Sequence, residues 1–131
     1  MRPLLFACFF FLLLSAQAQH SVTIRVNGYP AYHTAGSKVY VAGNFNNWNP
    51  QQERYVLQDK AITLIVPRGI LEYKLTRGGW DKVEAGKNGI QIENRRVQVD
   101  SDTVINIAIE HWSDHFPSMS KTSSANSNVR V

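Results

Sequence analysis

Short runs of alternating apolar and polar residues recur along the chain between residues 21 and 112. The runs lie at residues 22–26, 39–41, 62–66, 71–75, 97–99 and 105–109. Turn-forming residues such as Gly28, Pro67 and Gly78 separate them. Alternation with a period of two predicts strands that bury one face, and no stretch shows the period of an amphipathic helix. The pattern therefore predicts an all-β fold, an immunoglobulin-like sandwich of about seven antiparallel strands.

The two ends of the chain do not share this alternation. Residues 4–14 form an apolar run that follows Arg2 and is too short to cross a bilayer, and the AQA motif at 16–18 is typical of a signal-peptidase site. We therefore expect a signal peptide over residues 1–18, and export to the periplasm or to the outside of the cell. Residues 113–131 are rich in Ser and Asn, which predicts a flexible tail. A single domain, residues 20–112, lies between the two.

Charge and composition narrow the possible functions. The chain has 14 Lys and Arg against 10 Asp and Glu, a formal net charge of +4, and its basic residues are scattered. Scattered basic charge favours a solvated surface over a nucleic-acid site. The single cysteine, Cys8, falls within the apolar run, so the exported domain must fold without disulfides. The four histidines lack the spacing of metal ligands, and we expect neither a metal nor a cofactor.

A catalytic role has little support in the sequence. Asp81 and Glu84 are close enough in the chain to suggest the paired carboxylates of a glycosidase. Lys82 lies between them in a charged loop, so solvated or salt-bridged carboxylates are the simpler interpretation. No serine stands in a G-x-S-x-G motif. We therefore expect a protein without catalytic residues.

The segment of residues 40–50, YVAGNFNNWNP, places Trp48 in a turn rich in Gly and Asn. Trp48 either folds back to cap the core or offers a flat apolar face to a ligand. A sugar ring has an apolar face and a rim of hydroxyl groups, so its binding needs aromatic surface together with side-chain amides. The amides beside Trp48 belong to Asn44, Asn46, Asn47 and Asn49.

Three motifs together resemble a known family. Residues 39–48, VYVAGNFNNW, resemble the opening of starch-binding and glycogen-binding carbohydrate-binding modules, including the glycogen-binding domain of AMP-activated protein kinase β-subunits. The LEYKL run at 71–75 resembles the E-Y-K-F strand of this family, and Trp80 and Asn94-Arg95 resemble its second Trp and its N-R pair. The resemblance covers about residues 22–109 and implies an early-set immunoglobulin-like sandwich.

The resemblance also implies a function and a site. Trp48 and Trp80 would stack on successive glucose rings, Lys74 would reach sugar hydroxyls, and Asn94 would hydrogen-bond the ligand. Asn44, Asn46 and Asn47 are further candidates for hydroxyl contacts. The expected function is non-catalytic binding of α-glucan or a related polysaccharide, alone or in bringing a separate secreted hydrolase or esterase to the glycan.

An alternative interpretation remains for Trp80 and Asn94. Residues 76–84 are more charged than a typical starch site and resemble related early-set domains of secreted bacterial proteins, sometimes found before an esterase. In that variant Trp80, Glu84, Asn94 and Arg95 form a structural cluster. The chain would then be a structural or protein-interaction domain without sugar affinity. In either case Arg95 is expected to pair with Glu84 or Glu93 instead of with a ligand. Tyr73 is predicted to lie in the core under either interpretation.

Overall fold

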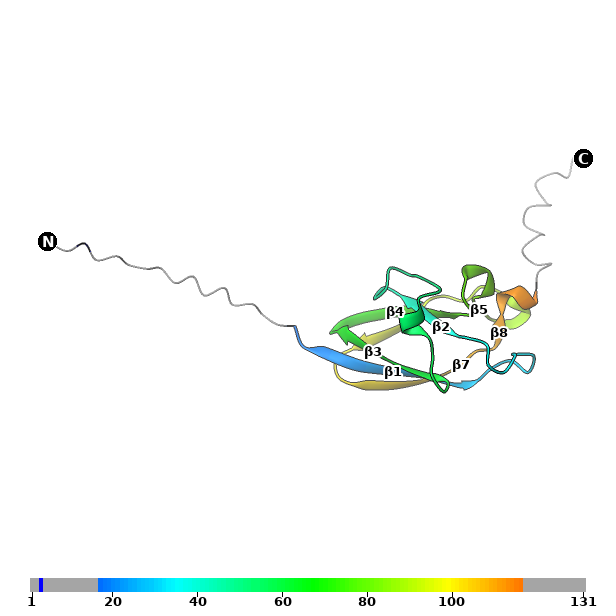
Figure 1. Ribbon diagram of the computed structural model, residues 1–131, viewed down its shortest axis with the longest axis horizontal. Coiled ribbons are helices and arrows are strands. Elements are labelled where there is room, and N and C mark those ends of the chain that lie inside the picture. Colours follow the sequence, from blue (N-terminus) through cyan, green and yellow to red (C-terminus); the bar gives the residue numbers. More distant parts are fainter. Residues whose placement is uncertain (1–2, 4–16, 117–131) are drawn as a thin grey trace, which may run out of the picture.

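The computed structural model describes residue 3 and residues 17–116, and within them it confirms the all-β sandwich (Figure 1). Two three-stranded sheets, in the orders β3-β1-β7 and β2-β4-β6, pack face to face beside a small β5-β8 pair. The strands are β1 (Gln19–Gly28), β2 (Tyr40–Gly43), β3 (Ala61–Pro67), β4 (Gly69–Thr76), β5 (Glu84–Ala85), β6 (Arg95–Val99), β7 (Thr103–Ala108) and β8 (His111–Trp112). Helical structure in this part of the chain is limited to the 3-10 turns η1 (Glu53–Tyr55), η2 (Trp80–Lys82), η3 (Lys87–Gly89) and η4 (Ser113–His115).

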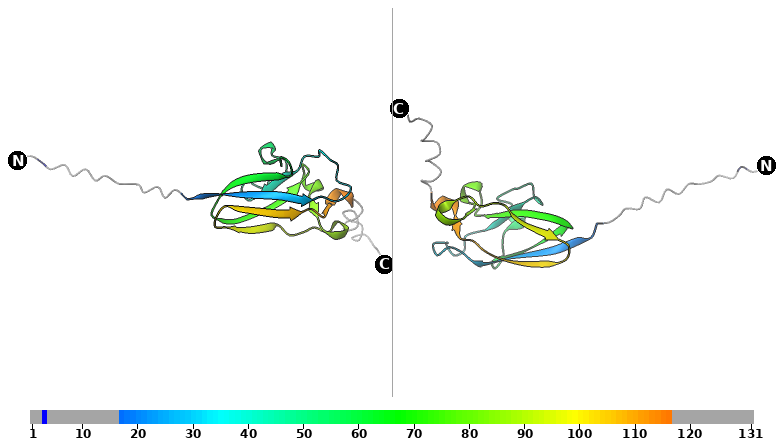
Figure 2. Two further views of the ribbon diagram at one scale, coloured as in Figure 1. Left: turned by 90° about the horizontal axis from the view of Figure 1, so that it is seen from below. Right: turned by 180° about the vertical axis from the view of Figure 1, so that it is seen from behind.

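The pairing of the strands differs in one respect from the predicted antiparallel sandwich. Within residues 17–116 the two main sheets contain six strands, and β1 pairs in parallel with β7, with Val22 opposite Thr103. Figure 2 (left) shows β3, β1 and β7 side by side. The connection between β6 and β7 passes from one sheet to the other, so β7 enters beside β1 instead of beside β6. The remaining pairs of the main sheets are antiparallel.

The core lies between the inward faces of the two sheets, as the alternation predicts. Val22, Ile24 and Leu64 from one sheet and Val41 and Leu75 from the other are each at most 2% exposed. Burial of such side chains is the main favourable term in folding, at roughly 25 cal/mol per Å² of apolar surface. Tyr73 is 2% exposed, which confirms its predicted place in the core.

A buried ion pair ties four strands together beside this core. The carboxylate of Glu84, on β5, accepts hydrogen bonds from Arg95 Nε and Nη2 at 2.8–3.1 Å and from the Leu75 backbone N–H at 3.1 Å. Arg95 Nη2 also donates to the carbonyl oxygen of Ala108 on β7. Burial alone would lower the pKa of Arg95, but the hydrogen bonds and charge of Glu84 outweigh it and raise that pKa. The salt-bridged interpretation of Glu84 is therefore confirmed.

The third tryptophan closes the end of the sandwich at β8. Trp112 is 1% exposed, and its Nε1–H donates to His33 Nδ1 at 3.0 Å. The ring of His33 stacks on Tyr29 with centroids 4.0 Å apart. The Arg77 guanidinium lies over the Trp112 ring, 5.3 Å from its centroid. This aromatic cluster fixes the last strand to the loop that follows β1.

Most of the predicted signal peptide and tail falls outside the described residues. Gln19 begins β1 opposite Pro67. Residues 113–116, which the sequence assigns to the tail, belong to the folded domain. His115 stacks on Tyr32 with ring centroids 3.6 Å apart, and Asp114 forms an ion pair with Arg77. No helix among the described residues is long and apolar enough to cross a membrane.

Candidate functional site

Trp48 and Trp80 lie next to each other, although 32 positions separate them in the chain. Their ring centroids are 6.4 Å apart and their planes are tilted by 43°. Trp80 is 44% exposed, and Trp48 is half-buried. Trp48 ends the turn that follows β2, and Trp80 begins η2, shortly after β4. Because β2 and β4 are antiparallel, the loops that follow them leave from opposite ends of the strand pair. The segment after β2 runs back along the sheet, so that Pro50 reaches Thr76 at the end of β4 and the two rings meet. We call Trp48 and Trp80 the Trp pair.

The turn that carries Trp48 has an unusual backbone, which Asn46 supports. Asn47 and Trp48 adopt φ angles of 53° and 57°, a left-handed conformation that costs roughly 1–2 kcal/mol for a residue with a Cβ. Asn46 Oδ1 accepts from the Gly43 N–H at 2.9 Å, and its Nδ2 donates to the carbonyl oxygens of Val41 and Asn49. Strain that neighbouring groups hold in place in this way is typical of functional sites.

The three asparagines predicted as ligand contacts differ in their surroundings. Asn44 extends the pairing of β2 with β4, since its Oδ1 accepts from the Glu72 N–H at 3.2 Å and its Nδ2 donates to the Ile70 carbonyl at 2.9 Å. The amide of Asn46 is occupied by the turn itself. Asn47 is exposed, and its side chain makes no hydrogen bond within the described part of the chain. Of these three amides, that of Asn47 is the one left for solvent or a ligand.

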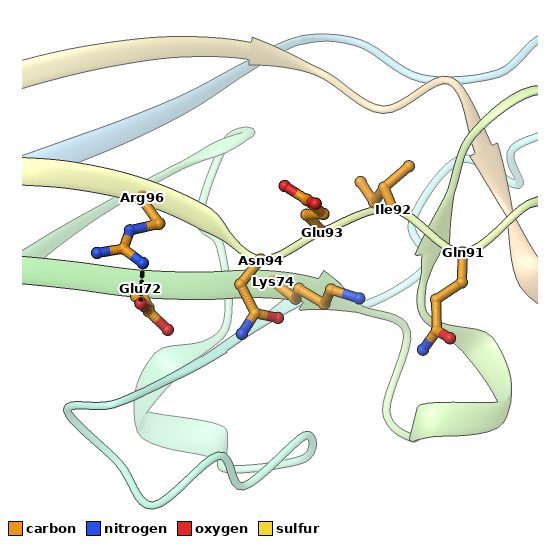
Figure 3. A pocket seen from close by; sticks show the side chains of 7 residues that line it. All are labelled: Glu72, Lys74, Gln91, Ile92, Glu93, Asn94 and Arg96. Atoms are coloured by element: carbon orange, nitrogen blue, oxygen red, sulfur yellow. Dashed lines mark ion pairs between the residues drawn. The ribbon is translucent and has the colours of Figure 1, made fainter.

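Lys74 and Asn94 line an open groove of about 500 Å³ on the outer face of the β2-β4-β6 sheet (Figure 3). The other lining residues are Glu72, Gln91, Ile92, Glu93 and Arg96. Lys74 is only 6% exposed, and its ammonium has no hydrogen bond or ion pair within residues 17–116. Arg96 and Glu72 form an ion pair of 3.0 Å in the same groove.

The groove and the Trp pair share one face of the sheet. Alternation along β4 places Glu72, Lys74 and Thr76 on this face, and the Thr76 hydroxyl contacts both Trp-bearing loops. Neither Trp lines the groove itself. The structure therefore brings Trp48 together with Trp80, and Lys74 together with Asn94, in two neighbouring parts of one surface.

The structural cluster considered as an alternative is present only in part. Glu84 and Arg95 form their ion pair, whereas the Trp80 ring lies against Trp48 and is exposed. Asn94 is exposed and lines the groove. Sequence reasoning did not single out Glu72, Gln91 or Arg96, although the alternation of β4 already places Glu72 on the same face as Lys74.

The comparisons with known proteins lead to amylolytic enzymes. No family model matches the chain. It is 36% identical over 101 residues to an α-amylase of Niallia circulans, a match that spans 72% of this chain and 8% of that protein. It is 37% identical over 92 residues to an amylopullulanase of Thermoanaerobacter thermohydrosulfuricus, spanning 63% and 6% of the two chains. An amylopullulanase of Thermoanaerobacterium thermosulfurigenes matches with 34% identity over 87 residues, or 58% and 5%. The chain thus spans less than a tenth of the length of these relatives.

Proposed function

We propose that this chain is a non-catalytic module that binds α-glucan, or a related polysaccharide, through the Trp pair. The observation that carries the proposal is the exposed position of Trp80 beside Trp48, with ring centroids 6.4 Å apart. Each indole can cover the apolar face of one sugar ring, at little cost in conformational entropy. Two tilted faces suit a polymer whose successive rings turn relative to each other, as they do in an α-glucan.

Polar side chains next to the Trp pair supply the contacts to hydroxyl groups. The Lys74 ammonium and the Asn94 amide face the groove, and Asn47 has its amide available beside Trp48. Lys74 is 6% exposed as a residue, and its ammonium has no protein partner within residues 17–116, so its N–H donors are available to water or a ligand in the groove. Asn44 and Asn46 belong to the same site as supports, because their amides hold the backbone from which Trp48 projects.

The names of the relatives and the small share of them that matches support an accessory role. Two of them are amylopullulanases and one is an α-amylase, and each matches over 8% of its length or less. The buried ion pair of Glu84 removes one of the two carboxylates that a glycosidase would need in this loop. We propose that the chain is exported by the signal peptide over residues 1–18. It would then bind the glycan alone or bring a separate secreted hydrolase or esterase to it.

Retention on insoluble starch tests this function. The mature chain, from residue 19 onward, is mixed with granular starch together with the variants Trp48→Ala, Trp80→Ala and Ile65→Ala. Ile65 is a matched control, because it is 62% exposed on β3, in the other sheet. Wild type and Ile65→Ala should be retained, and both Trp variants should remain in solution. Equal retention of Trp48→Ala and wild type would contradict binding through this site.

A further inference from the structure

One buried hydroxyl joins the two loops that carry the Trp pair. Thr76, the last residue of β4, is 0% exposed. Its Oγ1 donates to the Pro50 carbonyl oxygen at 2.6 Å and accepts from the Gly78 backbone N–H at 3.1 Å. Pro50 follows Trp48 by two residues, and Gly78 precedes Trp80 by two residues. The same side chain thus reaches both loops close to their aromatic rings.

The chemistry of threonine allows both contacts at the same time. A hydroxyl group has one hydrogen to donate and lone pairs to accept with, so neither bond displaces the other. Within the described residues, no other hydrogen bond joins residues 44–53 to residues 76–82. The contacts inside each loop, such as that from Lys82 N–H to the Gly79 carbonyl, shape that loop alone.

We propose that Thr76 is a positioning residue that fixes the spacing of the Trp pair. Because it is fully buried, it cannot touch a ligand and acts only through the loops of Trp48 and Trp80. A platform whose spacing is set before binding avoids the entropy cost of ordering two loops around the ligand. The consequence for affinity rests on the proposed function, whereas the consequence for the spacing of the rings does not.

Two substitutions separate the hydroxyl from the shape of the side chain. Thr76→Val keeps the volume and the β-branched shape but leaves the Pro50 carbonyl and the Gly78 N–H without their partner. Thr76→Ser keeps the hydroxyl and loses only a methyl group. If the hydroxyl positions the two loops, Thr76→Ser should behave like wild type and Thr76→Val should not. If Thr76 acts only by packing, Thr76→Val should behave like wild type and Thr76→Ser should not.

The first measurement is made without ligand, so it does not depend on glucan binding. Two indoles at this distance couple and give an exciton signal in far-ultraviolet circular dichroism, which Trp48→Ala and Trp80→Ala identify by abolishing it. We expect Thr76→Val to reduce this signal strongly and Thr76→Ser to keep it. A wild-type signal in Thr76→Val would overturn the proposal. Thr76→Ala repeats the test if the Val variant does not fold, as judged by thermal unfolding.

The second measurement is calorimetric titration with maltoheptaose. Thr76→Val should weaken binding about tenfold, which corresponds to roughly one lost hydrogen bond, and Thr76→Ser should bind within about twofold of wild type. Undiminished affinity in a Thr76→Val variant that has lost its exciton signal would refute the importance of fixed spacing. If wild type does not bind maltoheptaose, the proposed function fails, while the ligand-free signal still decides whether Thr76 sets the spacing.

Discussion

Glu84 on β5 and Arg95 on β6 form a bidentate ion pair in which the Glu84 side chain is 1% exposed. Glu84 also accepts from the Leu75 N–H, and Arg95 donates to the Ala108 carbonyl, so the pair links both main sheets to β5. β4 and β5 flank the loop that contains η2, which begins at Trp80. The ion pair therefore contributes to the site through the fold and not through contact with a ligand.

Removal of one partner from this pair should destabilise the protein strongly. We expect Glu84→Ala to lower the free energy of unfolding by about 3–5 kcal/mol, because Arg95 is left without its counter-charge. Urea denaturation of the mature chain measures this loss. The exposed pair of Arg68 and Asp100 provides the control, and Arg68→Ala should change the unfolding free energy little. A small effect of Glu84→Ala would mean that the ion pair does not hold the sheets together.

Asn46 and Asn47 are neighbours in one turn, and their substitutions should have different effects. Asn46→Ala leaves the buried Gly43 N–H without an acceptor, so the unfolding free energy should fall by about 1–3 kcal/mol. Asn47→Gly should preserve stability, because glycine accepts the left-handed backbone at φ 53°. Asn47→Gly should still weaken starch retention if its amide contacts the glycan. Equal stability of the two variants would contradict the assigned role of Asn46.

Lys74 is expected to favour binding at a cost in stability. Lys74 is 6% exposed and its ammonium has no partner in the described part of the chain, so Lys74→Met, which keeps an apolar chain of similar length, should leave the unfolding free energy unchanged or raise it. The same substitution should weaken binding of maltoheptaose about tenfold, through the loss of a charged hydrogen bond. Arg96→Met is a control in the same groove, because it removes a positive charge that already has a protein partner in Glu72. Loss of stability without loss of binding would show that Lys74 is a structural residue.

Stability should fall in acid because His33 must stay neutral to accept the Trp112 Nε1–H. Burial, and then the nearby positive charge of Arg77, lower the pKa of His33 in the folded protein. The unfolded chain therefore binds the proton more readily, and protonation of His33 favours unfolding. The stability that neutral His33 contributes is complete above about pH 6.5. It is lost as the pH falls from there through the lower folded pKa.

Unfolding by urea between about pH 8 and about pH 5 measures this dependence. His33→Phe keeps a ring to stack against Tyr29 and should flatten the curve over this range. A wild-type curve that is already flat, or one that His33→Phe leaves unchanged, would contradict the assignment to His33.

The sequence predicts which faces of the strands are buried much better than it predicts which strands are neighbours. Alternation placed Ile24 and Tyr73 in the core correctly, because it reports only the side of a strand that faces inward. It carries no information on pairing, so it did not predict that β1 runs parallel to β7. The same limit applies to Lys74, whose outward position did not indicate that residues 91–94 lie beside it in a groove.

Within the candidate site, the motifs predicted the residues better than their roles. Only the resemblance to a family suggested that Trp48 and Trp80 act together, since nothing local to either residue points to the other. An asparagine in a turn can bind a ligand or the backbone, and the structure assigns Asn44 and Asn46 to the backbone. Thr76 was not predicted, because its importance depends on two loops that meet only after folding.

The central claim is that the two rings of the Trp pair bind a glucan together, and titration of intrinsic fluorescence with maltoheptaose tests it most directly. Trp112 is buried and should give a constant background. We predict a saturable change in wild type, and no saturable change in either Trp48→Ala or Trp80→Ala, although both variants should unfold near the wild-type temperature. A saturable change that persists in both variants, or a wild type without any response, would contradict the account.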